Sequence, residues 1–460
     1  MIKHNTYAIF FLLTFLISCS SDDSSPAEDS GNTTDPIVFL GEIDWITTLG
    51  GTQEDTAQDI TMTADGGYAI VGYTESIDGD ITDNTSEQNN YWVARLDADG
   101  SLLWSKTYGG TADDRGEAIK TTADGGFIIT GYSRSGDEDV SQNSGFYDQW
   151  IVKLDAAGNI QWEKSFGFSG SDQAFDIMQT SDGGYFTTGF LDITASGGQG
   201  SVGRPSNSEG TVSSEHGVGE YWCHKLDATG NIVWSRYFGG SNNDRSYSTL
   251  ETDDNSFIIV GSSESDDFDI TNSQGSYDFW VVKMSNTGDL IWQKSYGGTG
   301  IDIGYDITKT NDGNYIVVGD TRSNDGNISN LKGSADFWII KINDADGALL
   351  WERTFGGSDF ESARGITSLQ DGGYAIVGSA KSDNVDINSN YGQNDFWVIK
   401  ISETGNLTWE KNFGGSQLDI AFSIIETNDK KLVIAGSTQS NDGDIVENKG
   451  IKDALILKIK

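Results

Sequence analysis

The chain has 460 residues, of which 36% are hydrophobic, and it contains 58 glycines but only 3 prolines. This composition excludes a disordered chain and favours a folded, turn-rich protein that can bury a large core. The formal charge of −41, from 70 acidic and 29 basic residues, argues against binding to nucleic acid phosphates or to anionic lipid headgroups.

The first segment, residues 1–19, has a basic start, an apolar run and a small residue before Cys19. This order is typical of a signal peptide, and the apolar run is too short to span a membrane comfortably. The tetrad Leu16-Ile17-Ser18-Cys19 resembles the lipobox of bacterial lipoproteins. The resemblance implies that residues 1–18 are removed and that Cys19 carries the lipid, palmitate included. A secretory signal with an incidental cysteine is the alternative.

Residues 19–36 have the composition of a lipidated cysteine followed by a solvated, flexible tether. Within it, Ser20-Ser21-Asp22-Asp23 resembles the signal that sends lipoproteins of some Bacteroidota to the outer face of the outer membrane. We therefore expect a lipid-anchored protein at the cell surface, with the periplasmic face as the alternative. Only Cys223 remains in the mature chain, which excludes an intramolecular disulfide and a cysteine metal site.

One motif then returns seven times, each copy an Asp, a short turn and an apolar strand that ends in Gly. The copies begin at Asp65, Asp124, Asp182, Asp254, Asp312, Asp371 and Asp429, so they are 58 or 59 residues apart except for one interval of 72. All 13 tryptophans fall into two series with the same spacing. A fixed period of this length predicts an array of equivalent units.

Each unit contains four short strand patterns. In the first unit these cover residues 57–63, 68–74, 91–97 and 101–110, with an Asp-Gly turn between the first two. Four antiparallel strands without helical periodicity are typical of a propeller blade. The sequence therefore predicts an all-β, seven-bladed β-propeller over residues 37–460.

The two ends of the array complete one another. Residues 453–460 match a third strand with no fourth strand after it, while residues 41–51 match a fourth strand with no unit before it. We expect the N- and C-terminal strands to pair and close the ring, which removes an exposed sheet edge. The long interval reflects an insertion in blade three, residues 191–219, which is either a functional loop or a tolerated one.

Three recurrent elements resemble the β-propeller repeats of bacterial secreted and surface proteins, and also the related delta-60 repeats. They are W-x-K-x-[YF]-G-G, D-G-G-Y-x-I-x-G and D-F-W-V-x-K, as in residues 292–298, 371–378 and 395–400. The resemblance covers residues 41–460 and implies the propeller fold. It implies no common enzymatic activity, and the mannose motif of the bulb-type lectins is absent from the sequence.

Most repeated residues have a structural explanation. Because every unit carries the same tryptophans, packing between blades explains them better than a ring of sugar-binding platforms. The glycine after each second strand predicts a bulge or a close backbone approach. The acids that follow each Gly-Gly pair, which we call the capping acids, predict turn caps; they are Asp55, Asp114, Asp172, Asp244, Asp302, Glu361 and Asp419.

Acidic loops follow the second strand in every unit except the third. Alternating carboxylates in a loop can converge on calcium, and the candidate ligands are Asp78, Asp80, Asp137, Asp139, Asp267, Asp269, Asp442 and Asp444. The loops lack the glycine and glutamate positions of an EF-hand. The alternative is that these aspartates form Asx turns.

Catalysis finds little support, because the mature chain has only His216 and His224 and offers no distinct nucleophile and base. With 70 acidic residues, a glycosidase pair is neither excluded nor nominated. We expect a monomeric surface lipoprotein that acts as a non-catalytic binding or scaffold module for an extracellular polysaccharide or protein. A carbohydrate-active enzyme and a purely structural envelope protein are the alternatives.

Overall fold

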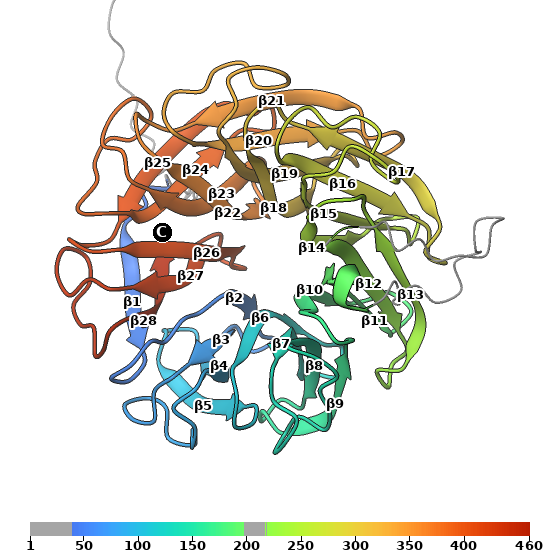
Figure 1. Ribbon diagram of the computed structural model, residues 1–460. Coiled ribbons are helices and arrows are strands. Elements are labelled where there is room, and N and C mark those ends of the chain that lie inside the picture. The colour runs from blue at the N-terminus through green and yellow to red at the C-terminus, as the bar shows by residue number, and fades with distance from the viewer. Residues whose placement is uncertain (1–38, 197–216, 218) are drawn as a thin grey trace, which may run out of the picture. The chain divides into compact units, whose positions relative to one another are not determined.

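The described part of residues 41–460 contains 28 strands, which pair into seven antiparallel sheets of four strands. The computed structural model describes residues 39–196, 217 and 219–460. Figure 1 shows the seven sheets as blades around a common axis. The predicted seven-bladed β-propeller with four strands in each blade is confirmed. The predicted signal peptide, Cys19 and the tether lie outside the described residues, as does most of the insertion in blade three.

The two inner strands of each blade come first in its sequence. The innermost strands are β2 (Asp59–Met62), β6 (Asp114–Thr121), β10 (Gln173–Gln179), β14 (Asp244–Glu251), β18 (Asp302–Lys309), β22 (Glu361–Ser368) and β26 (Asp419–Glu426). The second strands are β3 (Tyr68–Thr74), β7 (Phe127–Ser133), β11 (Tyr185–Leu191), β15 (Phe257–Ser263), β19 (Tyr315–Thr321), β23 (Tyr374–Ala380) and β27 (Leu432–Thr438).

The two outer strands follow. The third strands are β4 (Asn90–Leu96), β8 (Asp148–Leu154), β12 (Glu220–Leu226), β16 (Asp278–Met284), β20 (Asp336–Ile342), β24 (Asp395–Ile401) and β28 (Asp453–Ile459). The outermost strands are β5 (Leu102–Tyr108), β9 (Ile160–Phe166), β13 (Ile232–Phe238), β17 (Leu290–Tyr296), β21 (Leu349–Phe355), β25 (Leu407–Phe413) and β1 (Ile43–Leu49). A short helix, α1 (Ile193–Ser196), follows β11. In the described ranges, no helix has the length and apolarity to cross a membrane.

The ring closes through its first and last strands. In Figure 1 the blue β1 lies beside the red β28, and the two pair antiparallel from Ile43↔Ile459 to Leu49↔Ala454. The sheet order β1-β28-β27-β26 makes β1 the outermost strand of the last blade. The predicted pairing of the N- and C-terminal strands is thereby confirmed, and it covers the edge of β28 that an open array would expose.

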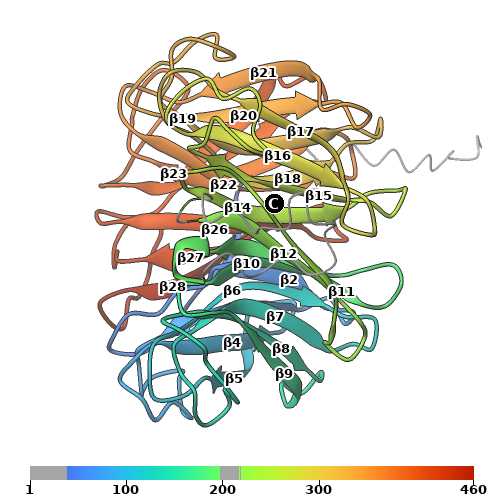
Figure 2. The same cartoon turned by 45° about the vertical axis from the view of Figure 1, so that its right-hand side comes forward.

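The hydrophobic core lies between neighbouring sheets, which Figure 2 shows packed face to face. The tryptophan in the third strand of a blade packs against the blade before it. The indole of Trp338, for example, is fully buried and lies 4.4 Å from the ring of Phe279. These contacts confirm that the tryptophans serve inter-blade packing.

The tryptophans of the outermost strands also bridge neighbouring blades. A methyl group placed on Gly100, which has φ +80°, would lie 2.6 Å from the Trp45 ring, and the later outer tryptophans cover equivalent glycines. The glycine is required both for the left-handed turn and for the close approach of the ring. Each outer tryptophan therefore covers the hairpin turn of the next blade.

Candidate functional site

A β-bulge in the innermost strands of six blades brings one extra residue of each of these blades to the axis. In β6, for instance, the pairing with β7 skips from Gly116 to Ala118 and leaves Glu117 unpaired. The second-strand glycine Gly131 makes the close approach that the sequence predicted, since a methyl group there would lie 2.0 Å from the Arg115 carbonyl oxygen. A bulge of this kind changes the direction in which the side chain of the extra residue points.

The bulge residues line a cavity of about 550 Å³ on the propeller axis. They are Glu117, Phe175, Tyr247, Tyr305, Arg364 and Phe422, and Gln58 takes the equivalent place before β2. The residue before this position is small in every blade, whereas the position itself carries a mixture of aromatic, charged and amide side chains. A cavity of this size and lining is suited to a small molecule or to part of a chain.

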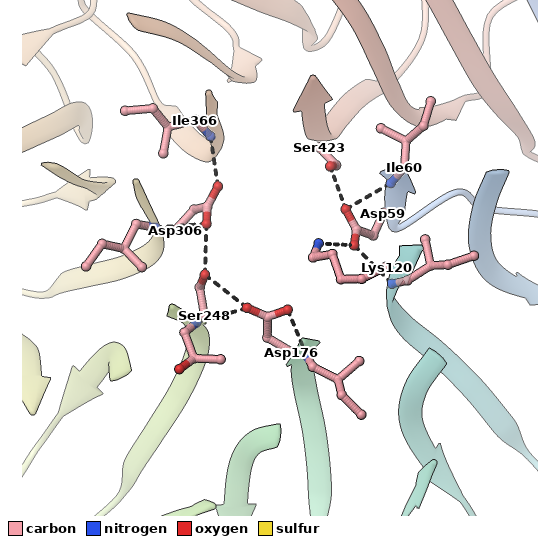
Figure 3. A network of polar contacts seen from close by, with 12 residues as sticks. Asp59, Ile60, Lys120, Asp176, Ser248, Asp306, Ile366 and Ser423 are labelled. Carbon is pink, nitrogen blue, oxygen red and sulfur yellow. Dashed lines mark hydrogen bonds and ion pairs between the residues drawn. The ribbon is translucent and has the colours of Figure 1, made fainter. Parts of the chain in front are cut away.

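Three aspartates at the next position, Asp59, Asp176 and Asp306, link the innermost strands across the cavity wall (Figure 3). Asp306 accepts hydrogen bonds from the Ser248 hydroxyl at 2.8 Å and from the Ile366 amide of the next blade at 2.9 Å. Asp176 accepts one from the Thr249 amide at 2.9 Å. These carboxylates hold neighbouring blades together at their narrowest point.

Asp59 joins the first, second and last blades. Its carboxylate accepts hydrogen bonds from the Ser423 hydroxyl at 2.7 Å and from the Ile119 amide at 3.0 Å, and it pairs with Lys120 at 2.7 Å. Burial raises the pKa of Asp306 to about 6, and the Asp176 carboxylate adds to that rise. Lys120 therefore offsets part of the negative charge of these aspartates, and Arg364 is a second cation that lines the cavity.

Glu117 is the acidic bulge residue of the cavity. Burial raises the pKa of its carboxyl to about 8, although the neighbouring Arg115 guanidinium opposes the rise. At neutral pH the side chain is thus largely protonated and can donate a hydrogen bond to a bound oxygen. A hydrogen bond with Tyr132 also opposes the rise.

The acidic loops clamp the connections between blades. Asp78, Asp137, Asp267 and Asp442 accept hydrogen bonds from the amides of Thr52, Thr111, Ser241 and Ser416 at 2.7–2.9 Å. Asp80, Asp139, Asp269 and Asp444 accept them from the amides of Gly50, Gly109, Gly239 and Gly414 at 3.0–3.4 Å. Asn384 accepts the equivalent bond from the Ser358 amide at 3.0 Å, so a neutral oxygen is sufficient for this role.

Calcium binding by these loops stays a prediction. Over the ranges 39–196, 217 and 219–460, the structure brings together no group of three acidic, histidine or cysteine side chains that could hold a metal. Because the aspartates bind amides, we expect calcium and sodium chloride at equal ionic strength to raise the melting temperature equally. Thermal melts with chelator, with calcium and with matched sodium chloride measure this. A rise in melting temperature that occurs only with calcium would indicate that the loops bind the ion.

The capping acids occupy the turns as predicted. All seven are fully buried, and the Asp302 carboxylate accepts hydrogen bonds from the Gly298 amide and the Ser323 hydroxyl, both at 2.8 Å. A second row of buried acids, which the sequence analysis did not single out, begins the third strands. It consists of Asp148, Glu220, Asp278, Asp336, Asp395 and Asp453.

Each acid of this second row faces the capping acid of the next blade. A methyl group on Gly297 would lie 2.1 Å from Asp278 Oδ1 and 2.7 Å from Asp302 Oδ2, so the two carboxyls share one small space. Asp278 Oδ1 has no hydrogen-bond partner among the described residues. Burial, with a contribution from Asp302, raises the pKa of Asp278 to about 6. We call these acids, together with their partners, the carboxyl pairs.

The histidine and cysteine of blade three are core residues. His224 is fully buried between the rings of Trp222 at 4.3 Å and Phe166 at 4.9 Å, and burial lowers its pKa to about 3. Cys223 is also fully buried, and burial raises the pKa of its thiol. Neither side chain reaches the cavity. His216 lies outside the described residues.

The sequence analysis missed the cavity residues because it searched for positions that repeat. A signal for them exists, since each of these residues stands three positions after a capping acid, at a place where the units differ from one another. At that spacing the chain has Gln58, Glu117, Phe175, Tyr247, Tyr305, Arg364 and Phe422. Variation at a fixed position of a repeat thus marked the cavity.

Solved propellers resemble this chain only distantly. The WD40 domain of Neurospora crassa Pan2 gives a TM-score of 0.48 at 9% identity, over 90% of this chain and 95% of that one. A protein of unknown function from Bacteroides caccae gives 0.39 at 10% identity, over 70% and 90%. Quinohemoprotein alcohol dehydrogenase from Comamonas testosteroni gives 0.44 at 8% identity, over 90% and 76%.

Sequence comparisons add a relative and a family. The regulatory protein FlaEY of Caulobacter vibrioides is 23% identical over 413 residues, which are 80% of this chain but 41% of that protein. This chain therefore spans about two fifths of the length of that relative. The profile of the family described as outer membrane protein assembly factor BamB matches residues 147–440. Because the match covers more than half of the chain, the protein belongs to this family of β-propeller repeat proteins.

Proposed function

We propose that this protein is a non-catalytic binding or scaffold module of the cell envelope, which binds an extracellular polysaccharide or protein in the axial cavity. The observation that supports the proposal is the departure from the repeat at the bulge position. Packing demands the same residues in every blade, as the tryptophans do, whereas a ligand without sevenfold symmetry requires different side chains around it.

We further propose that a lipid on Cys19 anchors the module to the outer membrane, with the propeller on the cell surface. The support is the resemblance of residues 16–23 to lipoprotein signals, together with the tether-like composition of residues 19–36. The periplasmic face is the alternative location. The charge of −41 makes nucleic acid an unsuitable partner and favours a monomer that stays apart from other copies.

One experiment tests both parts of this proposal. Intact cells that express the full-length protein are incubated with the labelled glycans and envelope proteins of an array, and bound label is measured on the cells. We expect binding by the wild type and its loss in Tyr247→Ala, because Tyr247 lines the cavity. In Cys19→Ala the binding should move from the cells to the medium. Tyr391→Ala, which removes an aromatic ring that is 51% exposed outside the cavity, is the matched control.

Equal binding by wild type and Tyr247→Ala would contradict the cavity as the site, provided that both proteins melt at the same temperature. Label that stays on cells expressing Cys19→Ala would contradict the lipid anchor. The location is read from the same cells, since external protease removes a surface protein but not a periplasmic one.

A carbohydrate-active enzyme is the second candidate, and the raised pKa of Glu117 favours it. A cavity carboxyl with a pKa of about 8 is protonated at neutral pH, as a general acid must be. Release of reducing ends from a bound glycan separates the two candidates. Turnover that is lost in Glu117→Gln would replace the binding module by an enzyme.

A further inference from the structure

Seven aromatic rings form a continuous surface that leads from the acidic-loop end of the propeller into the cavity. We call this surface the aromatic arc. Its rings are, in order, Phe146, Tyr147, Tyr132, Phe175, Tyr247 and Tyr305, with Phe190 beside Phe175, and the centroids of contacting rings lie 4.7–6.4 Å apart. Three of the rings, Phe175, Tyr247 and Tyr305, line the cavity. Phe146 is 49% exposed and its amide contacts the turn at Gly170.

Three arginines lie on this arc. The guanidinium of Arg134 stacks over Phe146 at 4.5 Å, that of Arg245 over Phe190 at 4.7 Å, and that of Arg364 over Tyr305 at 3.8 Å. None of the three forms an ion pair with a described carboxylate, in a chain whose formal charge is −41. By contrast, Arg115 pairs with Asp113 at 3.1 Å.

The absence of ion pairs on these arginines has a chemical consequence. A guanidinium that stacks on a ring keeps its N–H groups in its own plane, where they can bind a carboxylate or sulfate through two hydrogen bonds. Acidic side chains are abundant in this protein, yet the three stacked arginines contact rings instead. The hydrogen-bonding edges of Arg134 and Arg245 are thus available to an anion that comes from outside the chain, whereas Arg364 also hydrogen-bonds to Tyr305.

We propose that the aromatic arc binds an anionic polysaccharide. The apolar faces of the sugar rings pack on Tyr247 and Tyr305, and the carboxylate or sulfate groups pair with Arg134, Arg245 and Arg364. The cavity of about 550 Å³ accommodates a short segment or a chain end. A protein partner would need an interface above about 1,000 Å², whereas the arc is a narrow row of rings.

The net charge of the propeller is compatible with this ligand at physiological salt. Charges that are separated by more than about 8 Å are screened at 0.15 M ionic strength, so the arginines nearest the ligand dominate its electrostatic energy. Two carboxylates beside the arc accept hydrogen bonds from the protein. Asp320 Oδ1 accepts one from Ser362 at 2.6 Å, and Glu264 accepts one from Tyr277 at 2.9 Å. Asp320 Oδ2 has no hydrogen-bond partner among the described residues.

This inference rests on the proposed function and is tested by calorimetric titration at 0.15 M sodium chloride. The probes are hexameric oligogalacturonate, a sulfated galactan oligosaccharide and a neutral galactan oligosaccharide of equal length. We expect one or both anionic probes to bind and the neutral probe not to bind. Arg245→Gln and Arg134→Gln should each weaken binding about tenfold, the loss expected for a hydrogen bond to a charged group.

Arg353→Gln is the control, because Arg353 stacks over Trp351 at 5.5 Å on the outermost strand β21 and leaves the arc intact. A different result is that the neutral probe binds to the wild type and to Arg245→Gln but not to Tyr247→Ala. That result would contradict an anionic ligand and would still agree with the proposed binding module. Failure of both anionic probes to bind would also contradict an anionic ligand. Binding of polyglutamate without binding of either glycan would assign the arc to an acidic protein segment instead.

Discussion

Deletion of residues 37–51 is expected to destabilise the whole propeller and to convert the protein into oligomers. The deletion removes β1 and leaves the outer edge of β28 unpaired from Ala454 to Ile459. An unpaired edge of this length is a template for pairing with another chain. The loss should spread around the ring, because each blade is held by both of its neighbours.

Side-chain contacts of β1 set the size of this effect. Leu49 is buried in the core between the first and last blades, and the ring of Trp45 lies 5.8 Å from that of Tyr68. Asp44 also pairs with Lys431 at 2.8 Å and with Lys460 at 3.1 Å. Burial of one leucine and one tryptophan contributes about 5 kcal/mol, so we expect the free energy of unfolding to fall by at least that amount.

Calorimetry and light scattering after gel filtration measure the two consequences of the deletion. Removal of residues 20–36 is the matched control, since it shortens the chain by a similar length and leaves every strand that the structure describes in place. That control should melt like the wild type and stay monomeric. A monomer without residues 37–51 and with an unchanged melting temperature would show that β1 does not hold the ring closed.

The sequence predicted the architecture in detail because the same packing contacts recur in every blade. The residues that make these contacts therefore recur at a fixed spacing along the chain. Trp45 and its equivalents, the glycines at hairpin turns, and the fourth-strand pattern of residues 41–51 each follow from one rule that applies to every blade. Closure could be predicted because two incomplete ends matched one another. Packing of this kind involves only a repeat and its neighbour, so its pattern can be recognised in the sequence alone.

The cavity could not be predicted in the same way, because its residues come from different blades and lie close together only in the closed ring. Asp59 and Ser423 are separated by 364 positions and bind one another at 2.7 Å. The bulge that exposes Glu117 and Tyr247 depends on strand register, which a sequence pattern does not specify. The carboxyl pairs were missed for a related reason, since Asp278 and Asp302 belong to different blades and each resembles an ordinary turn residue alone.

The carboxyl pairs predict that stability falls as the pH rises from about 4.5 to 8. Burial raises the pKa of Asp148, Asp278, Asp336 and Asp453 to about 6 and that of Asp395 to about 7, above the usual value of 3.8. A raised carboxyl pKa means that the folded state binds protons more tightly than the unfolded state. Its stabilisation is fully present below pH 3.8 and is lost as the pH passes through the folded pKa of 6–7.

Blade one shows how such a pair can be relieved. Asn90 takes the place of the second-row acid there, and a methyl group on Gly109 would lie 2.3 Å from Asn90 Oδ1 and 2.5 Å from Asp114 Oδ2. An amide thus fits beside a capping acid in this protein and carries no charge at any pH. Asp278→Asn reproduces that arrangement in blade four, where the Gln274 amide donates to the Asp278 carboxylate at 2.6 Å.

We therefore expect Asp278→Asn to stabilise the propeller at pH 8 by about 2 kcal/mol, somewhat less than the full linkage energy of a pKa shift of about two units. At pH 4.5, where Asp278 is already protonated, the substitution should change little. Urea unfolding of both proteins from pH 4.5 to 8 measures the difference. The general charge repulsion is nearly the same in the two proteins, because the chain has a formal charge of −41. The difference between their free energies of unfolding therefore reports on the carboxyl pair alone.

Asp325→Asn is the control, because the pKa of Asp325 is shifted in the opposite direction to that of Asp278. The Asp325 carboxylate lies in an acidic loop at the surface, and hydrogen bonds from Thr299 lower its pKa. Its ionised form is the favoured one, so neutralisation should give no gain at pH 8. If Asp278→Asn were instead less stable than the wild type at both pH values, the two carboxyls would have to be held apart by an ion or a water, and the propeller would carry a bridging group between its blades.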